Sequence, residues 1–332
     1  MPLPVSWKIQ PTPNSATPPK PEAWKTSLAP AKGLNSFWYQ QSVTLPRQWE
    51  KQRVFLDFHR IEGDAILFVN DQKVGELLRP GGEIEISSQA KAGADNVIRV
   101  FVTRDYTDIS RTFEQDRIRY ICRNSASGKV AMENWGVGIS GPVDLLSRPR
   151  PAGIASVVVD TSWRKKEMAF DIEIDADSPV EGLSAIIDVL DANGAKAFSF
   201  ESKLPAITAG HAKVRVASTW EGPKLWELDG GYLYTAEVRL LRDNAILDTA
   251  PPFQFGFREI WTDGRKLMMN GHETHWRLTF LHASSFGDAS PKGMAFARLM
   301  GYNAGYIQDH PESWWRGSGW APETPLFNLA AR

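Results

Sequence analysis

The chain has one cysteine, Cys122, among its 332 residues. A single cysteine cannot form an internal disulfide, and a lone cysteine is more often a small buried hydrophobe than a nucleophile. The cysteine content therefore does not indicate the cellular compartment of the protein.

The chain also lacks an excess of either charge. Lys and Arg total 38, Asp and Glu total 39, and the formal net charge is −1. We therefore expect no nucleic-acid partner. The sequence also has no charged tail that would bind a membrane surface. No apolar run reaches the roughly 18 residues of a membrane span. The first residues, 1–7, contain no apolar signal core. This start is compatible with a cytoplasmic protein, or with a periplasmic or secreted protein whose signal was removed.

Two common chemical motifs are missing as well. No phosphate-binding loop of the GxxxxGK[ST] form occurs, which argues against nucleotide chemistry. His272 and His275 flank Glu273 at a spacing of three, unlike the HExxH helix of zinc proteases, and their context is that of a strand. We predict no metal site and no cofactor.

Short β-branched and aromatic runs separated by polar turns dominate the first half of the chain. This pattern is typical of an all-β sandwich. A first domain is predicted over residues 34–148, after an extended lead-in over residues 1–33 that is rich in Pro and contains no element. Its predicted strands are 37–45, 53–58, 65–69, 84–86 and 96–102.

A second domain is predicted over residues 149–256, after a linker at Pro149–Pro151. Its predicted strands are 154–159, 168–174, 185–190, 213–216 and 232–241, and residues 191–194 form a hairpin turn. The alternation of Tyr234, Ala236, Val238 and Leu240 indicates one buried strand face. We expect an immunoglobulin-like sandwich.

Residues 257–332 show a different pattern. A strand over 275–280, a helix over 292–302, a strand over 303–308 and a helix opening at 327–332 make two units of a β/α repeat. A closed (β/α)8 barrel needs about 250 residues, so two units cannot close one. The predicted class is therefore mainly β: two sandwiches followed by the truncated start of a barrel.

Five stretches resemble glycoside hydrolase family 2, the group of β-galactosidases, β-glucuronidases and β-mannosidases. They occur in the family's order between residues 37 and 311. The stretches are Trp38-Tyr39 followed by the hairpin at 65–75, the run 135–145, the run 225–234, Phe255-Gly256-Phe257-Arg258, and Asn270-Gly271. The resemblance implies that the first domain is a sugar-binding, galactose-binding-like jelly roll and that the third is the start of a TIM-barrel catalytic domain.

The same resemblance implies a retaining β-glycosidase. Such an enzyme needs two carboxylates about 5 Å apart, and the family places both on later barrel strands. No Asn-Glu dipeptide occurs in residues 257–332. We therefore assign no catalytic residue and interpret the chain as an inactive N-terminal part of such an enzyme. The alternative is a non-catalytic carbohydrate-binding or scaffolding protein of two sandwiches. Both hypotheses predict a carbohydrate partner, and both are compatible with a homo-oligomer.

Three residues of the motifs are predicted to have interdomain structural roles. Gly256 permits a tight backbone at the junction. Arg258 has a guanidinium that can bind carboxylate or carbonyl groups across it. Asn270, like Asn70, is predicted to lie in a turn at positive φ.

The candidates for substrate binding lie near the ends of predicted strands or in loops. Glu133, before Trp135, occupies the position of an acidic residue that reaches the sugar site in the β-galactosidase branch; the alternative is an exposed loop carboxylate. The stretch 303–311 resembles a barrel motif but has Tyr306 in place of an Arg, and His310 comes one place late. The remaining candidates are His282, Asp309, His310, Trp314 and Trp315. The two tryptophans either form a stacking wall for a sugar or pack under the loop.

Overall fold

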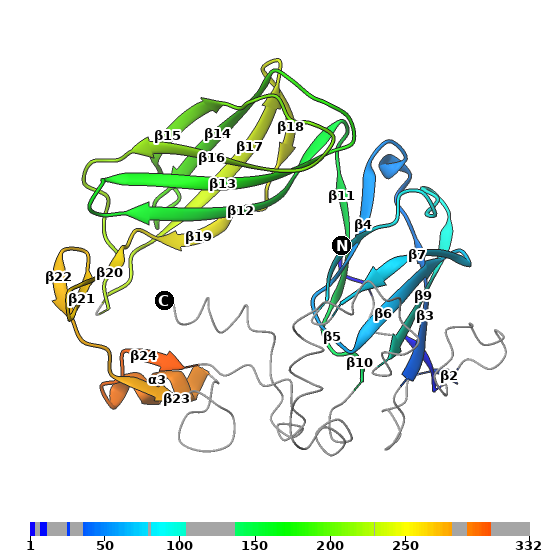
Figure 1. Cartoon of the computed structure of the whole chain (residues 1–332), viewed down its shortest axis with the longest axis horizontal. Coiled ribbons are helices and arrows are strands. Elements are labelled where there is room, and N and C mark those ends of the chain that lie inside the picture. The colour runs from blue at the N-terminus through cyan, green and yellow to red at the C-terminus, as the bar shows by residue number, and fades with distance from the viewer. Residues whose placement is uncertain are drawn as a thin grey trace. The chain divides into compact units, whose positions relative to one another are not determined.

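The computed structural model describes residues 1–3, 7–11, 25–26, 36–78, 81–103, 137–228, 230–280 and 291–306. These residues fall into two compact units that divide between Ser147 and Arg148 (Figure 1). The division lies next to the predicted linker at Pro149–Pro151. It does not separate the residues after 257 from the second sandwich, so a third domain stays a prediction.

The first unit consists of antiparallel sheets around one apolar core. The largest has six strands in the order β2-β1-β3-β9-β6-β7, a second has the order β11-β4-β8, and β10 pairs with β5. The strands are β1 (Lys8–Pro11), β2 (Lys25–Thr26), β3 (Ser36–Thr44), β4 (Arg53–Phe58), β5 (Ile61–Glu62), β6 (Asp64–Val69), β7 (Gln72–Leu77), β8 (Gly82–Glu85), β9 (Asp95–Thr103), β10 (Gly138–Ile139) and β11 (Val143–Arg148), with a 3-10 turn η2 (Arg47–Trp49).

Side chains that alternate along these strands form the core of the first unit. Phe37 and Tyr39 of β3 and Leu56 of β4 belong to one buried cluster. Trp38, between the two β3 residues, packs on the opposite face of the sheet with Phe101 at a ring-centroid distance of 5.3 Å. The sheet is thus apolar on both faces at this point.

The hairpin between β6 and β7 confirms the turn at positive φ predicted for Asn70, and strand β7 already begins at Gln72. Asn70 has φ 51° and Asp71 has φ 66°, the left-handed pair that a two-residue hairpin requires. The Asn70 amide donates to Asn96 Oδ1 at 2.9 Å and its oxygen accepts from Val97 N at 3.0 Å. The side chain therefore attaches the turn to the neighbouring strand β9.

The run 135–145 contains a glycine with no room for a side chain. A Cβ on Gly138 would overlap the hydroxyl of Tyr39, and φ is 140° there. Burial raises the pKa of Tyr39 to about 12, partly offset by a hydrogen bond with the backbone of Ile139. Gly138 thus lets the end of the first unit close over a buried tyrosine.

The lead-in was predicted to contain no element, and this prediction is wrong. Lys8–Pro11 forms β1, which pairs with β3, and β2 pairs with β1. Leu3 and Trp7 are buried, and Trp7 meets the Tyr39 ring edge-on at 6.3 Å. The prolines that suggested a coil lie around the strand, and burial of Leu3 and Trp7 decides the structure.

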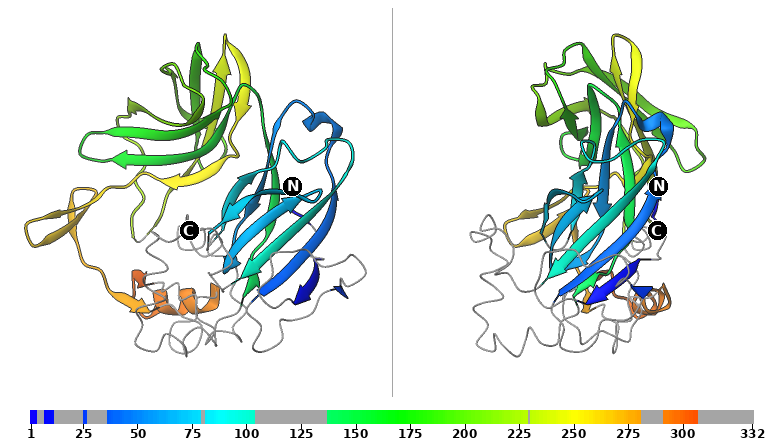
Figure 2. Two further views of the ribbon diagram at one scale, coloured as in Figure 1. Left: turned by 45° about the vertical axis from the view of Figure 1, so that its right-hand side comes forward. Right: turned by 90° about the vertical axis from the view of Figure 1, so that its right-hand side faces the viewer.

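The second unit begins with a sandwich of two antiparallel sheets, visible as two layers in Figures 1 and 2. One sheet has the order β12-β13-β16 and the other β15-β14-β17-β18, with β19 also on β17. The strands are β12 (Ala152–Ser162), β13 (Glu167–Ala176), β14 (Leu183–Leu190), β15 (Lys196–Lys203), β16 (Gly210–Thr219), β17 (Leu233–Arg242), β18 (Ala245–Thr249) and β19 (Phe253–Gly256). The predicted strands of this region are confirmed, whereas β15, β18 and β19 were not predicted.

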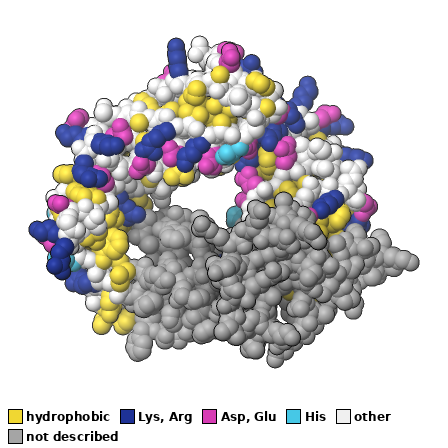
Figure 3. Space-filling model, in the orientation of Figure 1, with side chains coloured by type: hydrophobic (Ala, Val, Ile, Leu, Met, Phe, Trp, Pro, Cys, Tyr) yellow, Lys and Arg dark blue, Asp and Glu magenta, His cyan; other side chains and the backbone are white. Residues whose placement is uncertain are grey.

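The sandwich keeps its apolar and charged residues on separate faces. Met168, Phe170, Ile172 and Ile174 of β13 are buried between the sheets. The acids between them face outward, where Asp171 pairs with Arg215 and Asp175 with His211 on β16. Figure 3 shows Lys, Arg, Asp and Glu side chains interspersed over this unit.

Beyond the sandwich, three short strands form an antiparallel sheet in the order β20-β21-β22. They are β20 (Ile260–Asp263), β21 (Lys266–Met269) and β22 (His272–Thr274). β22 agrees with the strand context predicted for residues 272–275, whereas β20 and β21 were not predicted. Asn270 lies in the turn between β21 and β22 with φ 48°, which confirms its predicted conformation.

The last described segment has the order strand, helix, strand, as predicted. β23 (Leu278–Phe280) and β24 (Ala304–Tyr306) are parallel, and α3 (Pro291–Leu299) lies between them in the chain. A parallel pair requires such a crossover. β23 begins later than predicted because the Asn303 side chain accepts from Arg277 N at 2.7 Å and donates to His275 O at 2.9 Å. The helix predicted at 327–332 lies outside the described residues. No helix within the described ranges has the length and apolarity to span a membrane.

Replacing Trp7 by Ala tests whether the lead-in is part of the first unit. Loss of a buried Trp costs about 3–5 kcal/mol, so amide hydrogen exchange in β1 and β3 should accelerate. Lys8→Ala, at an exposed neighbour, should leave exchange unchanged. Equal exchange in Trp7→Ala and the unmodified chain would show that the lead-in is dispensable.

Candidate functional site

The three predicted junction residues all contact one residue, Trp226, in the loop before β17. A Cβ on Gly256 would lie 2.7 Å from Cβ of Trp226. The Arg258 guanidinium lies 4.4 Å from the centroid of the Trp226 ring. Asn270 Nδ2 donates to the Trp226 carbonyl at 2.9 Å. Trp226 N in turn donates to the Phe257 carbonyl at 2.9 Å.

Asn270 fixes the turn of the β20–β22 sheet to the sandwich. Its side chain is 2 % exposed. Its amide also donates to Glu227 Oε1 at 3.0 Å, and its Oδ1 accepts from Glu259 N at 2.9 Å. Its backbone N–H donates to the Glu259 carbonyl at 3.0 Å. All hydrogen-bonding groups of the buried amide thus have partners, as burial requires.

A second set of contacts holds the same segment to the tip of the β12–β13 hairpin. The Trp163 and Trp261 rings stack at 6.1 Å with an interplanar angle of 16°. The Arg164 guanidinium lies 4.6 Å from the Trp261 ring and donates to Glu259 Oε1 at 2.8 Å. Gly271 has no room for a Cβ beside the Trp163 ring. We call the two sets together the junction cluster: Trp163, Arg164, Trp226, Glu227, Gly256, Arg258, Glu259, Trp261, Asn270 and Gly271.

The junction cluster shifts the pKa of three of its ionisable groups. The hydrogen bond with Glu259 raises the pKa of Arg164. Burial alone would raise the pKa of Glu259, but hydrogen bonds from Arg164 and Ser162 outweigh it, so the pKa lies below 4.5. Burial lowers the pKa of Arg258 below the usual value of a guanidinium, although the residue still has solvent-exposed surface. The guanidinium packs on an aromatic ring in a cation–π contact; the sequence analysis had expected it to bind a carboxylate or a carbonyl.

A cavity of about 420 Å³ lies beside the junction cluster. It is lined by Glu227, Leu228, Met269, His272, Glu273 and Thr274. His272 Nε2 lies 3.5 Å from the Glu227 carboxylate, and Glu273 pairs with Lys266 at 3.0 Å. Within the described residues no three His, Cys, Asp or Glu side chains form a metal-binding group. These acids already have partners, and the arrangement serves to connect segments.

All candidates for substrate binding lie outside the described residues, as does Cys122. They are Glu133, Trp135, His282, Asp309, His310, Trp314 and Trp315. Their roles stay predictions. The sequence analysis missed the junction roles of Trp163, Arg164, Glu227, Glu259 and Trp261, although Trp226 and Glu227 lie in one of the family-like stretches.

Comparison with known proteins places this fold among the glycosidases. Residues 152–258 match the family model of glycosyl hydrolases family 2. A β-glucuronidase of Paenibacillus borealis is 23% identical over 301 residues, which cover 87% of this chain and 47% of the relative. A β-galactosidase of Bacteroides ovatus is 22% identical over 277 residues, 80% of this chain and 30% of the relative.

Solved structures share the fold of this chain. The β-glucuronidase of Bifidobacterium dentium, complexed with coumarin-3-O-glucuronide, superposes on 100% of this chain and 59% of its own with a TM-score of 0.71 at 19% identity. A β-galactosidase-like protein of Bacteroides fragilis superposes with a TM-score of 0.69 at 16% identity, over 100% of this chain and 52% of its own. The predicted resemblance to glycoside hydrolase family 2 is confirmed. The chain spans about half the length of the Paenibacillus relative.

Changing Asn270 to Asp tests the amide that joins the turn to the sandwich. The new carboxylate faces Glu227 and the Trp226 carbonyl, so two donors are lost and a like charge is buried. We expect a loss of about 3 kcal/mol in the free energy of unfolding at pH 7, smaller at low pH where one carboxyl is protonated. Urea denaturation followed by tryptophan fluorescence measures it.

Asn244→Asp is the matched control for this change, because Asn244 has φ 65° and is exposed. The Asn244→Asp substitution should lower the free energy of unfolding only slightly. Adding Glu227→Gln to Asn270→Asp should recover stability, since the Gln amide can donate to Asp. A destabilisation equal in both Asn variants, or no recovery in the double variant, would contradict the described bonding.

Glu259→Gln tests the ion pair with Arg164. The folded-state pKa of Glu259 lies below 4.5, so protons bind preferentially to the unfolded chain, and stability falls as the pH drops through the folded pKa. The free energy of unfolding of the unmodified chain should exceed that of the variant by about 1 kcal/mol at pH 7. This difference should decline as the pH falls below 4.5 through the folded pKa of Glu259. Glu221→Gln, which removes an exposed pair with Lys166, is the control and should change the free energy of unfolding little at pH 7. A constant difference from pH 7 to 3 would rule the ion pair out.

Proposed function

We propose that this chain is the N-terminal part of a retaining β-glycosidase of family 2 that hydrolyses O-glycosidic bonds in carbohydrates. Its catalytic carboxylates would belong to barrel strands outside these residues. The observation that carries the proposal is the parallel β23–α3–β24 segment that follows the β-rich first unit and the sandwich of the second unit, because this order matches that of the family-like motifs. The β-glucuronidases and the β-galactosidase that match the chain support the reaction class.

Within this proposal the predicted domains have distinct tasks. Residues 34–148, with β1 added to their sheet, form the jelly roll, and residues 149–256 form the immunoglobulin-like sandwich. Residues 257–332 open the catalytic barrel. The junction cluster would set the angle at which the barrel starts, because Asn270, Gly256 and Arg258 all depend on Trp226.

The proposed substrate is a β-glycoside, and the candidate contacts are those named from the sequence. Asp309 and His310 would follow the second barrel strand, where barrel sites lie. Glu133 and Trp135 would come from the jelly roll. The departures in the stretch 303–311, Tyr306 for an Arg and the late His310, favour a sugar other than a standard galactoside or glucuronide.

The test compares two proteins on 4-nitrophenyl β-glycosides: the 332-residue chain and the product of its uninterrupted source reading frame. We expect no hydrolysis by the first. We expect a continuation of roughly 250 residues and hydrolysis by the second. Sequencing 3′ of the Arg332 codon gives the frame.

Two results would contradict the proposal. A stop codon directly after Arg332 in the source would favour a non-catalytic carbohydrate-binding or scaffolding protein of two sandwiches. Hydrolysis by the 332-residue chain alone would place a carboxylate pair within these residues.

A further inference from the structure

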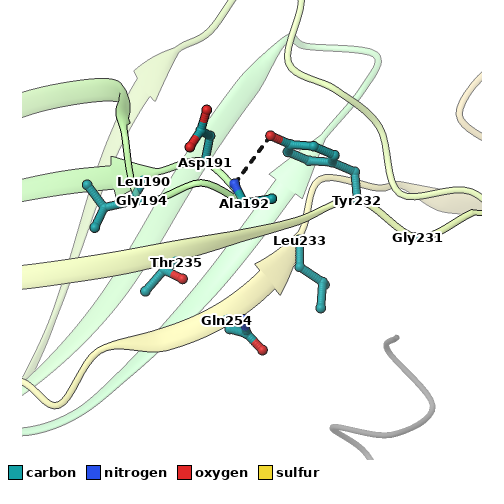
Figure 4. Close-up of a pocket in the computed structure, with 9 residues that line it drawn as sticks. All are labelled: Leu190, Asp191, Ala192, Gly194, Gly231, Tyr232, Leu233, Thr235 and Gln254. Carbon is teal, nitrogen blue, oxygen red and sulfur yellow. Dashed lines mark hydrogen bonds between the residues drawn. The ribbon is translucent and has the colours of Figure 1, made fainter.

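A cavity of about 440 Å³ lies on the outer face of the larger sheet of the second sandwich, and no residue of the junction cluster lines it. Its walls come from the end of β14, the turn that follows it, the start of β17, and β19 (Figure 4). The volume falls in the range of about 300–1,000 Å³ that is typical of small-molecule sites. Neither the proposed reaction nor the junction uses it.

The floor of this groove is a row of three side chains from adjacent strands. Thr235 of β17 pairs with Leu190 of β14 on one side and with Gln254 of β19 on the other. Residues directly opposite each other in a sheet share a face. Tyr234 and Ala236, the neighbours of Thr235, are buried in the core, so this row points away from the core.

The floor has free hydrogen-bonding groups. Among the residues that the structure describes, neither the Thr235 hydroxyl nor the Gln254 amide has a hydrogen-bond partner. The rim, in contrast, is fixed: Asp191 Oδ1 accepts from Asn193 N at 2.8 Å and from Ala195 N at 2.9 Å. The Tyr232 hydroxyl accepts from Ala192 N at 3.3 Å (Figure 4). The groove is therefore held in shape without using the groups on its floor.

The chemistry of the groove selects an uncharged ligand rich in hydroxyl groups. An amide and a hydroxyl both donate and accept, as sugar hydroxyls do. Leu190, Leu233 and the Tyr232 ring offer apolar surface for the C–H faces of a sugar. The one carboxylate in the lining, Asp191, is already bonded to the turn. The Lys224 ammonium packs on the Tyr232 ring at 4.7 Å and is not part of the described lining.

We propose that this groove is a binding site for a neutral oligosaccharide. Binding here would use only the second sandwich, so it goes beyond the proposed function and does not depend on hydrolysis. Thr235 and Gln254 supply the hydrogen bonds, and Tyr232 and the two leucines supply the contact surface.

The test is isothermal titration calorimetry on the 332-residue chain. The probes are cellohexaose, xylohexaose, mannohexaose, a β-1,4-linked galactohexaose and, as the charged comparison, a hexamer of galacturonic acid. We expect at least one neutral hexasaccharide to bind and the acidic hexamer not to bind. The double variant Thr235→Val/Gln254→Met keeps side-chain size and removes both floor groups, and should weaken that binding roughly tenfold or more.

Thr249→Val, on the exposed strand β18 of the same sheet, is the matched control and should bind like the unmodified chain. Gln254→Met alone, at an exposed position, keeps the test valid if the double variant is unstable; it should weaken binding severalfold. Three results would overturn the proposal: no binding of any neutral hexasaccharide, binding of the acidic hexamer only, or equal binding by the unmodified chain and the folded variants.

Discussion

The contacts of Trp226 are the constraint on which the arrangement of the second unit depends. Its ring lies under Arg258 and allows no Cβ at Gly256, and its carbonyl accepts from Asn270. One residue thereby links the loop before β17, the end of β19 and the turn of the next sheet. Because each contact restricts a different segment, the backbone that leaves the sandwich has a defined direction. A smaller residue at position 226 would remove the contacts with Arg258 and Gly256, whereas the carbonyl that accepts from Asn270 belongs to the backbone.

Much of the fold follows from local pattern. Strong alternation, as in Tyr234, Ala236, Val238 and Leu240, predicted β17 closely, and Asn70 and Asn270 marked turns at positive φ. β1 was missed because prolines around it resemble a coil, while the burial that decides it, at Leu3 and Trp7, is a tertiary effect. β15 was missed because its polar residues mask the alternation of Phe198 and Phe200, which pack against the core of the sandwich.

The candidate site was predictable only in part. Gly256, Arg258 and Asn270 could be named from motifs, yet their meeting point, Trp226, depends on pairing between segments far apart in the sequence. Arg258 was expected to reach a carboxylate or a carbonyl, and the local aromatic ring holds it instead. The stacked pair of Trp163 and Trp261 has no sequence signature, because one lies in a hairpin tip and the other in a short strand. The groove at Thr235 and Gln254 likewise exists only once β17 and β19 are paired.

The central claim is that this chain forms the front of a retaining β-glycosidase. The most direct test is proton NMR of the first sugar product released from a β-glycoside by the protein of the full reading frame. A retaining mechanism releases the β-anomer first, before mutarotation, because two displacements occur at the anomeric carbon. Release of the α-anomer first, or the absence of any hydrolysis, would contradict the account.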